Sequence, residues 1–329
     1  MEELLISANL RPALGLLIFA SLALDGFRAI AGEASTSTHV ILLIVDGERY
    51  SETWGSPGRD NIPRRANELA PQGTLLTHCM NDGNTYTLPG HCALLTGHND
   101  EIQGNGSDFP SHPSLFQLLL AQKLPAERAW LVTSKGKLKV LINCTDPVWR
   151  DRYIAREDCG DPKSVGGNRD DKETIAKARE ILQEHEPKFM AINLKEPDIA
   201  AHRQDWHGYL QAIKDCDEIA ADLWKWIQAN PTFKDKTTLV ITNDHGRHIE
   251  GRMEGYVSHG DGCSGCRHIG CLVLGPNIRR DTVLYERFTQ RDIASTLALL
   301  LGVELLKSEG KPILGLFSSP TPEQRPLKN

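Results

Sequence analysis

The stretch His39–Val45 (HVILLIV), which leads directly into Asp46-Gly47, decides the fold of this chain. Its apolar residues are nearly continuous rather than alternating with polar ones, which is typical of a strand covered on both faces in a parallel sheet. In open α/β sheets, ligands bind at the carboxyl ends of the strands. The stretch therefore predicts a buried central strand of an α/β fold, with the Asp46 carboxylate at the edge where a ligand site would form.

Four more stretches of this kind follow, separated by segments with helical spacing of apolar residues. The stretches are Ala129–Thr133 (AWLVT), Phe189–Leu194 (FMAINL), Thr237–Thr242 (TTLVIT) and Gly270–Leu274 (GCLVL), and the helical segments are residues 112–122, 172–184, 208–228 and 290–301. Alternating strands and helices predict a doubly wound α/β fold with a mostly parallel central sheet and helices on both faces. The polar segment 144–170 is predicted to be a loop or a small cap. No linker divides residues 37–329, for which we expect a single catalytic domain.

The composition is that of a globular protein and excludes several classes. Of the 329 residues, 40% are hydrophobic and 24% are charged, and the formal net charge is −6. Disordered and fibrous chains have a different balance. The chain carries no run of Lys or Arg, so we expect no nucleic-acid polymer as a partner.

The N-terminal segment predicts export. Residues 12–24 (PALGLLIFASLAL) form an apolar run bounded by Arg11 and Asp25, and small residues follow at 29–32. Such a run is short for a membrane span and fits the hydrophobic part of a secretory signal. We predict a signal peptide and leader over residues 1–36 and a periplasmic or secreted mature chain, with a retained N-terminal membrane anchor as the alternative. Export would place the eight cysteines in a compartment where disulfides form.

Acids and histidines follow three of the predicted strands. Asp46 follows the first strand, Asp198 and His202 follow FMAINL, and Asp244-His245 follows TTLVIT. The i, i+4 spacing of Asp198 and His202 places both on one face of a helical turn. Carboxylates and imidazoles are ligands for Zn²⁺ and similar ions, so these side chains predict a metal site at the sheet edge. For any single Asp, the alternative is an N-cap of the next helix.

A candidate nucleophile lies in residues 84–91 (NTYTLPGH), just before the short helical pattern CALLTG. The Thr87 hydroxyl would lie beside the N–H groups of a helix N-terminus, which favour a phosphate or another tetrahedral anion. The alternative is a cap or turn residue, which is the commoner role of a Thr near Pro and Gly.

Taken in order, these motifs resemble those of the alkaline phosphatase superfamily: Asp46, TLPGH at 87–91, Asp198-x-x-x-His202, Asp244-His245-Gly246 and a later His. The similarity is greatest to the branch that contains nucleotide pyrophosphatase/phosphodiesterases and Thr-nucleophile alkaline phosphatases. It spans residues 40–315 and includes HPSLF at 112–116 and DIASTL at 292–297. The resemblance implies an alkaline-phosphatase-like domain over residues 37–329.

The resemblance implies a site for two divalent metal ions, with Zn²⁺ as the family expectation and Mn²⁺ or Mg²⁺ as alternatives. One ion would be held by Asp46, Thr87, Asp244 and His245, and the other by Asp198, His202 and a third His. For this third ligand, the family's HG-type turn favours His259 over His268, which lies too close to the strand that ends before Gly275-Pro276. His268 would then be a structural residue.

The implied reaction is hydrolysis of a phosphomonoester or phosphodiester through a phospho-threonine intermediate on Thr87. By the same resemblance, Asn105, Lys135 and Lys137 would bind the phosphate group, and their alternatives are a turn Asn and a solvated Lys pair. We expect a small phosphorylated substrate. The choice between esters stays open, because the two lysines favour monoesters and the pattern of Thr87 and Asn105 is shared with diesterases.

Two other functions are compatible with the same motifs. A sulfatase-like hydrolase is disfavoured, because that branch needs a Cys or Ser in C/S-x-P-x-R, where this chain has Thr87 and no Arg. A catalytically silent metal-binding protein would keep the ligands but show no turnover that depends on Thr87.

The motif Cys263-x-x-Cys266, with His268 and Cys271 just after it, has three interpretations. In an oxidising compartment it favours disulfides, with partners among the other cysteines. Its spacing also fits a small structural Zn²⁺ site. Free thiols are the third alternative.

Overall fold

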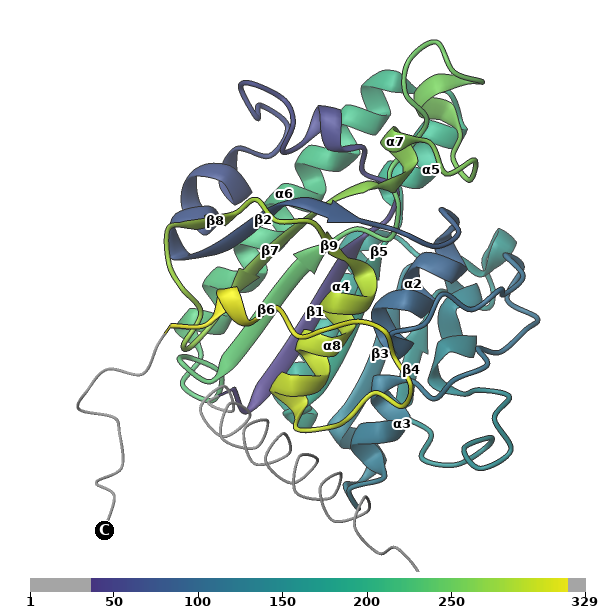
Figure 1. Cartoon of the computed structure of the whole chain (residues 1–329), viewed down its shortest axis with the longest axis vertical. Coiled ribbons are helices and arrows are strands. Elements are labelled where there is room, and N and C mark those ends of the chain that lie inside the picture. The colour runs from purple at the N-terminus through teal and green to yellow at the C-terminus, as the bar shows by residue number, and fades with distance from the viewer. Residues whose placement is uncertain (1–36, 319–329) are drawn as a thin grey trace, which may run out of the picture.

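One mixed sheet forms the centre of the molecule in the computed structural model, which describes residues 37–318. The predicted signal peptide and leader lie outside the described residues. The strands are β1 (His39–Val45), β2 (Gly73–Met80), β3 (Ala129–Thr133), β4 (Arg156–Cys159), β5 (Phe189–Leu194), β6 (Thr237–Thr242), β7 (His268–Leu274), β8 (Thr282–Leu284) and β9 (Phe288–Thr289). Their order is β4-β3-β5-β1-β6-β7-β2-β8, and β9 pairs with β2 (Figure 1).

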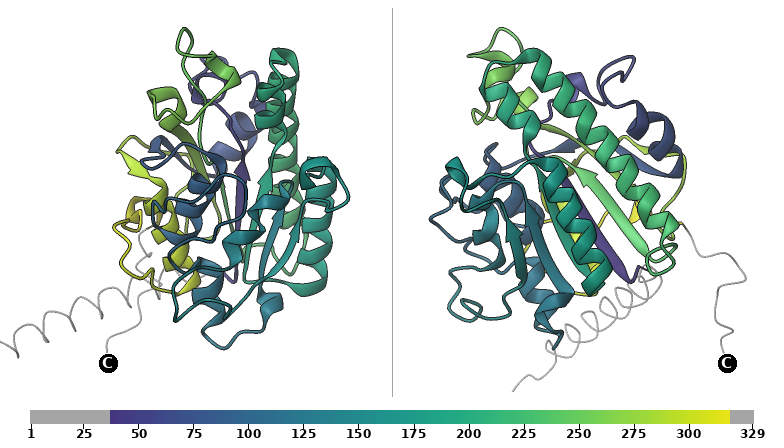
Figure 2. Two further views of the ribbon diagram at one scale, coloured as in Figure 1. Left: turned by 90° about the vertical axis from the view of Figure 1, so that its right-hand side faces the viewer. Right: turned by 180° about the vertical axis from the view of Figure 1, so that it is seen from behind.

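Helices cover both faces of the sheet (Figure 2). The α-helices are α2 (Thr87–Thr96), α3 (Leu115–Leu120), α4 (Asp171–His185), α5 (Glu196–His202), α6 (Trp206–Ala229), α7 (Ser264–Arg267) and α8 (Gln290–Leu301). Short 3₁₀ segments connect them at Tyr50–Glu52, Ala70–Gln72, Ala126–Arg128, Gly136–Ile142, Val165–Gly167, Gly255–Val257 and Leu314–Leu316, with one π-helical turn at Arg65–Leu69. The predicted helical segments correspond to α3, α4, α6 and α8.

Strand β1 divides the core into two halves. Its residues Val40, Leu42 and Ile44 pack in a hydrophobic cluster with residues of α2, α3 and α8, whereas the alternate residues pack with α4 and α6. Every residue of β1 is therefore buried, as the continuous apolar pattern predicts. The strand pairs in parallel with β5 and β6, which confirms the doubly wound α/β prediction.

The structure corrects three details of the predicted sheet. Strand β7 runs antiparallel to both β6 and β2, and it begins two residues earlier than expected, at His268. Strand β2 was not expected, because its sequence GTLLTHCM is polar in its second half. The segment 144–170 contains the edge strand β4, whose sequence REDC carries no apolar signal, so this segment extends the sheet as well as looping.

The carboxyl ends of β1, β5 and β6 lie side by side and end at one edge of the sheet (Figure 1). Gly47 turns the chain at this edge with a φ of +72°, and a Cβ there would lie 2.8 Å from Arg247 Nη1 and 3.0 Å from Asp198 Oδ1. A glycine is needed at this position because both the backbone angle and the space exclude a side chain. Within residues 37–318, no helix is both long and apolar enough to cross a membrane.

Candidate metal centre and nucleophile

Three predicted ligands meet at the ends of β1 and β6. We call Asp46, Asp244 and His245 the inner cluster. His245 Nε2 lies 3.3 Å from Asp244 Oδ2 and 3.7 Å from Asp46 Oδ1, and all three side chains are fully buried. These three atoms have no hydrogen-bond partner among the described residues. Buried polar atoms are rarely left unpaired, so their convergence fits a bound cation.

The protonation of His245 supports this interpretation. Its Nδ1 lies 2.9 Å from the carbonyl oxygen of Gly246, and N–H donation to that oxygen leaves the Nε2 lone pair facing the two carboxylates. Burial lowers the pKa of His245 to about 3, against the opposing effect of Asp244. The ring is therefore neutral at physiological pH and able to act as a ligand.

A second group lies beside the first, and we call Asp198, His202 and His259 the outer cluster. The two histidine Nε2 atoms are 3.1 Å apart, and they lie 3.3 Å and 3.5 Å from Asp198 Oδ1. Helix α5 presents Asp198 and His202 from one face, as their spacing predicts. His259 Nδ1 lies 2.9 Å from the carbonyl oxygen of Thr85, which orients the ring, and burial lowers the pKa of His259 to about 4. This donor set also fits a divalent ion.

Two cations already contact the Asp198 carboxylate. Arg247 Nη1 donates to Oδ1 at 2.6 Å, and Lys135 Nζ donates to Oδ2 at 2.7 Å. Burial alone would raise the pKa of Asp198, but Lys135, His202 and Arg247 outweigh it and hold the pKa well below its usual range. Lys135 Nζ also lies 2.9 Å from Asp46 Oδ2, so one ammonium group links the inner and outer clusters.

The candidate nucleophile Thr87 is the first residue of α2 and is buried. Lys135 Nζ lies 3.3 Å from its Oγ1, which places the hydroxyl beside the cation that links both clusters. The helix reaches this close because Gly90 has no side chain, since a Cβ there would lie 2.4 Å from the carbonyl oxygen of Asp244. The hydroxyl is thus at a helix N-terminus and next to two candidate ion sites.

His91 supports the nucleophile helix and belongs to neither cluster. Its Nδ1 lies 2.8 Å from the carbonyl oxygen of Thr87 and 3.2 Å from Asp244 Oδ2, and its Nε2 faces the amide of Asn193 at 3.1 Å. Asn193, at the end of β5, also donates to Asp46 Oδ2 at 3.2 Å. The pair holds the inner cluster against α2.

Two of the predicted phosphate-binding residues lie outside both clusters. The exposed Asn105 accepts hydrogen bonds from the backbone N–H and the hydroxyl of Ser107, which is the alternative turn role. Lys137, in the 3₁₀ segment Gly136–Ile142, donates from Nζ to the carbonyl oxygen of Gly104 at 3.0 Å, so Lys137 lies beside the loop that holds Asn105. A cavity of about 520 Å³ lies beside the N-terminus of α2, lined by Asn84, Tyr86, Pro89, Glu101, Ile102, Gln103 and Gly104.

Arg247 and Asn193 also belong to the site but were not predicted from the sequence. The position of Arg247 directly after Asp244-His245-Gly246 is the signal that could have found it, although its complete burial has no sequence signature. Arg247 also donates to the carbonyl oxygens of Tyr256 and Val257, and so ties the loop before His259 to Asp198.

A buried ion triad anchors the loop that follows β1. Arg65 pairs with Glu48 through two hydrogen bonds of 2.7 Å and 2.8 Å, and with Asp217 of α6 at 3.0 Å. All three side chains are almost fully buried. Because Glu48 lies two residues after Asp46, the triad fixes the backbone that carries the inner cluster.

The remaining metal and cysteine predictions have a mixed outcome. His268 is structural: its Nε2 bonds the carbonyl oxygen of Thr77, and its ring stacks on Tyr50. All eight cysteines are free thiols in the structure, so the disulfides that the sequence favours are not formed there. Cys271 is buried in β7 and stays apart from Cys263 and Cys266.

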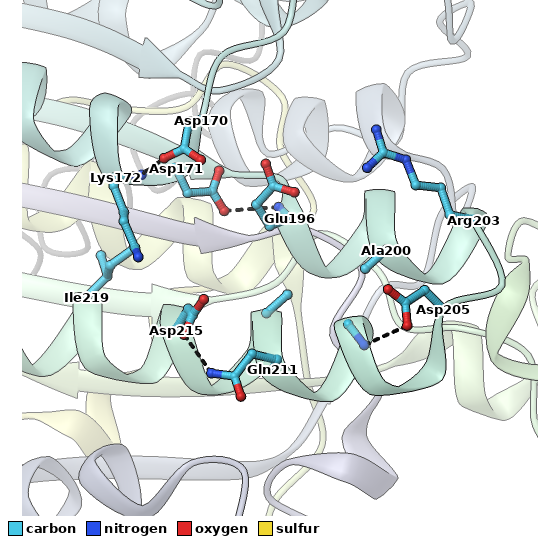
Figure 3. A pocket seen from close by; sticks show the side chains of 12 residues that line it. Asp170, Asp171, Lys172, Glu196, Ala200, Arg203, Asp205, Gln211, Asp215 and Ile219 are labelled. Atoms are coloured by element: carbon cyan, nitrogen blue, oxygen red, sulfur yellow. Dashed lines mark hydrogen bonds between the residues drawn. The ribbon is translucent and has the colours of Figure 1, made fainter.

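A second pocket lies between α4, α5 and α6 (Figure 3). On the side of α5 it is lined by Glu196, Ala200 and Arg203, the residue that follows the helix, and the helical spacing of Glu196 and Ala200 places them on the face opposite to Asp198 and His202. Two of its acids cap helices, since Asp170 accepts from the N–H of Lys172 and Asp205 from that of Gly208. Its other acids also have partners among the described residues, such as Gln211 for Asp215.

A family comparison agrees with these clusters. The model of the Metalloenzyme superfamily matches residues 131–305, which is more than half of the chain. The chain belongs to this superfamily. Membership implies a divalent metal, and the inner and outer clusters are residue groups that fit one.

A curated relative of the chain is a phosphopentomutase from Pseudothermotoga lettingae. The identity is 27% over 129 residues, which are 39% of this chain and 30% of that protein. In this match the chain covers less than a third of the relative's length.

Solved structures share the fold of this superfamily member. Murine ectonucleotide pyrophosphatase/phosphodiesterase 5 has a TM-score of 0.63 and 15% identity, covering 85% of this chain and 100% of that one. The phosphonate monoester hydrolase of Agrobacterium radiobacter has a TM-score of 0.60 and 15% identity, with coverage of 88% and 78%. The PsFucS1 sulfatase from Pseudoalteromonas sp. has a TM-score of 0.62 and 14% identity, with coverage of 89% and 76%. These likenesses confirm the alkaline-phosphatase-like fold of the Metalloenzyme superfamily.

Proposed function

We propose that this chain is a metal-dependent phosphoric ester hydrolase with Thr87 as its nucleophile. The observation that carries the proposal is the position of the Thr87 hydroxyl at the N-terminus of α2, 3.3 Å from Lys135 Nζ, which itself contacts both Asp46 and Asp198. The Thr87 hydroxyl thus lies beside the Lys135 ammonium and both candidate ion sites. This arrangement suits the transfer of a phosphoryl group.

The two clusters would hold two divalent ions, Zn²⁺ first, with Mn²⁺ or Mg²⁺ as alternatives. Asp46, Asp244, His245 and the Thr87 hydroxyl would bind one ion, and Asp198, His202 and His259 the other. When bound, such ions act as Lewis acids on phosphoryl oxygens and favour ionised oxygen nucleophiles at neutral pH.

In the first proposed step, Thr87 Oγ1 forms a bond to phosphorus while the bond from phosphorus to the ester oxygen breaks. Thr87 Oγ1 gives up its proton to water as it attacks, the leaving oxygen takes up one proton in exchange, and phospho-threonine remains. In the second step, a water oxygen attacks phosphorus and gives up a proton, and Thr87 Oγ1 leaves and takes up that proton. The Lys135 ammonium and the N-terminal N–H groups of α2 would stabilise negative charge on the phosphoryl group throughout.

The cavity beside α2 supplies a place for the rest of a small phosphorylated substrate. Tyr86 and Asn84 line it next to the nucleophile, and the loop that contacts Lys137 borders it at Gly104. A base or another flat group could stack on the half-exposed Tyr86 ring. Lys137 and Asn105 would then act on the distal part of the substrate, with the choice of monoester or diester set there.

The test compares initial rates for p-nitrophenyl phosphate, bis-p-nitrophenyl phosphate and p-nitrophenyl sulfate on the Zn²⁺-loaded chain. We expect turnover of a phosphate ester and a loss of about 10³-fold or more in Thr87→Ala, because the nucleophile is removed. Thr87→Ser is the matched control and should keep part of the rate. Metal binding without Thr87-dependent turnover would favour the silent protein, and preferred cleavage of the sulfate would favour the sulfatase.

We also propose export of the chain to the periplasm or to the outside of the cell, based on the apolar run at residues 12–24. Detection of a shortened mature N-terminus in an extracytoplasmic fraction would support it. Recovery of the full chain in the membrane fraction would indicate the retained anchor instead.

A further inference from the structure

A third group of metal-ligating side chains lies outside the inner and outer clusters. It consists of His248, Asp261, Cys263 and Cys266, and we call it the thiol cluster. His248 lies in the loop after β6, Cys263 directly precedes α7, and Cys266 lies within that helix. One ligand atom from each residue lies within 4.8 Å of the others. The cluster thus joins two segments that precede and follow His259.

The distances within the thiol cluster match the edges of one coordination tetrahedron. The two sulfur atoms are 3.7 Å apart, and His248 Nδ1 lies 3.7 Å from Cys263 Sγ and 3.3 Å from Cys266 Sγ. Tetrahedral Zn²⁺, with bonds of about 2.3 Å to sulfur and about 2.0 Å to nitrogen, would place two sulfurs about 3.8 Å apart and a sulfur and a nitrogen about 3.5 Å apart. A disulfide would need the sulfurs at about 2 Å.

The fourth ligand is held in place by other contacts. Asp261 Oδ1 lies 2.8 Å from His248 Nδ1 and 3.5 Å from Cys266 Sγ, and Asp261 Oδ2 pairs with Arg252. One carboxylate oxygen therefore faces the cluster while the other is neutralised. The side chains of His248 and Asp261 are 1% and 16% exposed, so the cluster is shielded from solvent on most sides.

We propose that the thiol cluster is a structural metal site that binds Zn²⁺ or a similar thiophilic ion through two thiolates, one imidazole and one carboxylate. Four protein ligands leave no open position for a substrate, which is typical of structural rather than catalytic zinc. The proposal is independent of the proposed hydrolase function. It assigns a different His to the Cys-x-x-Cys motif than the sequence favoured, because His268 is turned toward Thr77.

The structural consequence is control over the position of His259. His248 N–H donates to the carbonyl oxygen of Ser258 at 3.0 Å, and the next residue is His259 itself. Asp261 lies two residues beyond His259, so ligands on both sides of this loop would be fixed by one ion. The ion would cross-link the loop as a disulfide would, but through four side chains.

The test measures metal content and thiolate coordination in the full mature chain. Elemental analysis of the wild type should give one more equivalent of metal than the double variant Cys263→Ser/Cys266→Ser. Cys159→Ser is the matched control, since Cys159 is partly buried like Cys263 but lies outside the cluster, and it should keep the full content. Loading with Co²⁺ should produce the charge-transfer absorption of thiolate-bound cobalt in the wild type and the control only.

Two further measurements make the result independent of turnover and of variant folding. Asp46→Asn, which disables the inner cluster, should keep the thiolate absorption whatever happens to the hydrolase activity. Titration of the wild type with a thiol-binding mercurial should release one equivalent of metal to a coloured chelator. A wild type without thiolate absorption, a mass lower by two hydrogens from a Cys263–Cys266 disulfide, or equal metal content in the double variant would overturn the proposal.

Discussion

The inner and outer clusters contain similar ligands, but their surroundings differ in charge and exposure. In the inner cluster, three buried atoms face one another without hydrogen-bond partners, and two carboxylates meet a neutral imidazole. In the outer cluster, one carboxylate is contacted by Arg247 and Lys135, and the His202 side chain is 43% exposed. An ion in the inner cluster would therefore face two carboxylates that share one cation, Lys135, whereas an ion in the outer cluster must share one carboxylate with two cations, Lys135 and Arg247. The two clusters should therefore bind a divalent ion with different affinities, although their ligands are similar.

The largest effect is expected from Asp46→Asn. It removes one of the two inner carboxylates and leaves the isosteric amide, so the inner ion should be lost and hydrolysis should fall by about 10³-fold or more. Metal content by elemental analysis and initial rates on the preferred ester would measure both. A variant that retained both the ion and the rate would show that the inner cluster is not the dominant site.

A smaller effect is expected from His202→Ala in the outer cluster. Because this ligand is partly exposed and Asp198 and His259 remain, the rate should fall by about 10-fold to 100-fold and recover in part at higher Zn²⁺ concentration. His207→Ala is the matched control, since His207 is an exposed histidine of the neighbouring helix α6. Equal losses in His202→Ala and Asp46→Asn would remove the proposed difference between the clusters.

Arg247→Met tests the cation that competes for Asp198. Without the guanidinium, the outer ion should bind about 10-fold more tightly, because Asp198 Oδ1 is no longer shared. The same change removes bonds to Tyr256 and Val257, so the free energy of unfolding should fall by about 3 kcal/mol. Competition with a chelator and urea denaturation would measure the two effects separately. If the affinity of the outer cluster for its ion were unchanged or weaker, competition between Arg247 and the ion for Asp198 would be contradicted.

The smallest effect concerns Asp171, which supports the start of α5, the helix that carries Asp198 and His202 of the outer cluster. Asp171 accepts hydrogen bonds from the N–H groups of Lys195 and Glu196 at the start of α5. Burial raises the pKa of Asp171 to about 6 from its model-peptide value of 3.8. The folded state therefore favours the protonated form, and this contribution to stability is complete below pH 3.8 and is lost as the pH rises through about 6.

In the metal-free chain, this loss should amount to about 1–3 kcal/mol between pH 4 and pH 7. Asp171→Asn should reduce the pH dependence by that amount, as measured by urea denaturation at both pH values. A pH dependence identical to that of the wild type would show that folding does not change the pKa of Asp171. The inner cluster should be unaffected in either case, because β1 and β6 carry it independently of α5.

Most of the fold and the clustering of the candidate metal ligands could be predicted because these side chains follow buried strands. The continuous apolar pattern of β1, β5 and β6 identified each strand with its bounds, and strand direction then placed Asp46, Asp198 and Asp244 at one edge. The antiparallel direction of β7 could not be predicted, since an apolar run carries no information on strand direction. Edge strand β4 has no apolar residues to signal it.

Contacts between loops could not be predicted from the sequence. The Cys-x-x-Cys motif suggested a metal site, but its histidine is His248, which lies fifteen residues before Cys263 and reaches it only because the loop folds back. Arg247 was missed because a buried arginine has no periodic signature and depends on a carboxylate supplied by another element. For Asn105, the family resemblance suggests a substrate contact, and in the structure its side chain accepts hydrogen bonds from Ser107 in a local turn, so its role stays a prediction.

The buried triad of Glu48, Arg65 and Asp217 determines how the protein would acquire its ions. Because the triad joins the loop after β1 to α6, the backbone beside Asp46 is held by contacts that involve no ion. Loading would then follow folding, and each ion would add stability in proportion to the logarithm of its free concentration. The melting temperature should therefore report the metal supply of the surroundings, while the shape of the molecule stays the same.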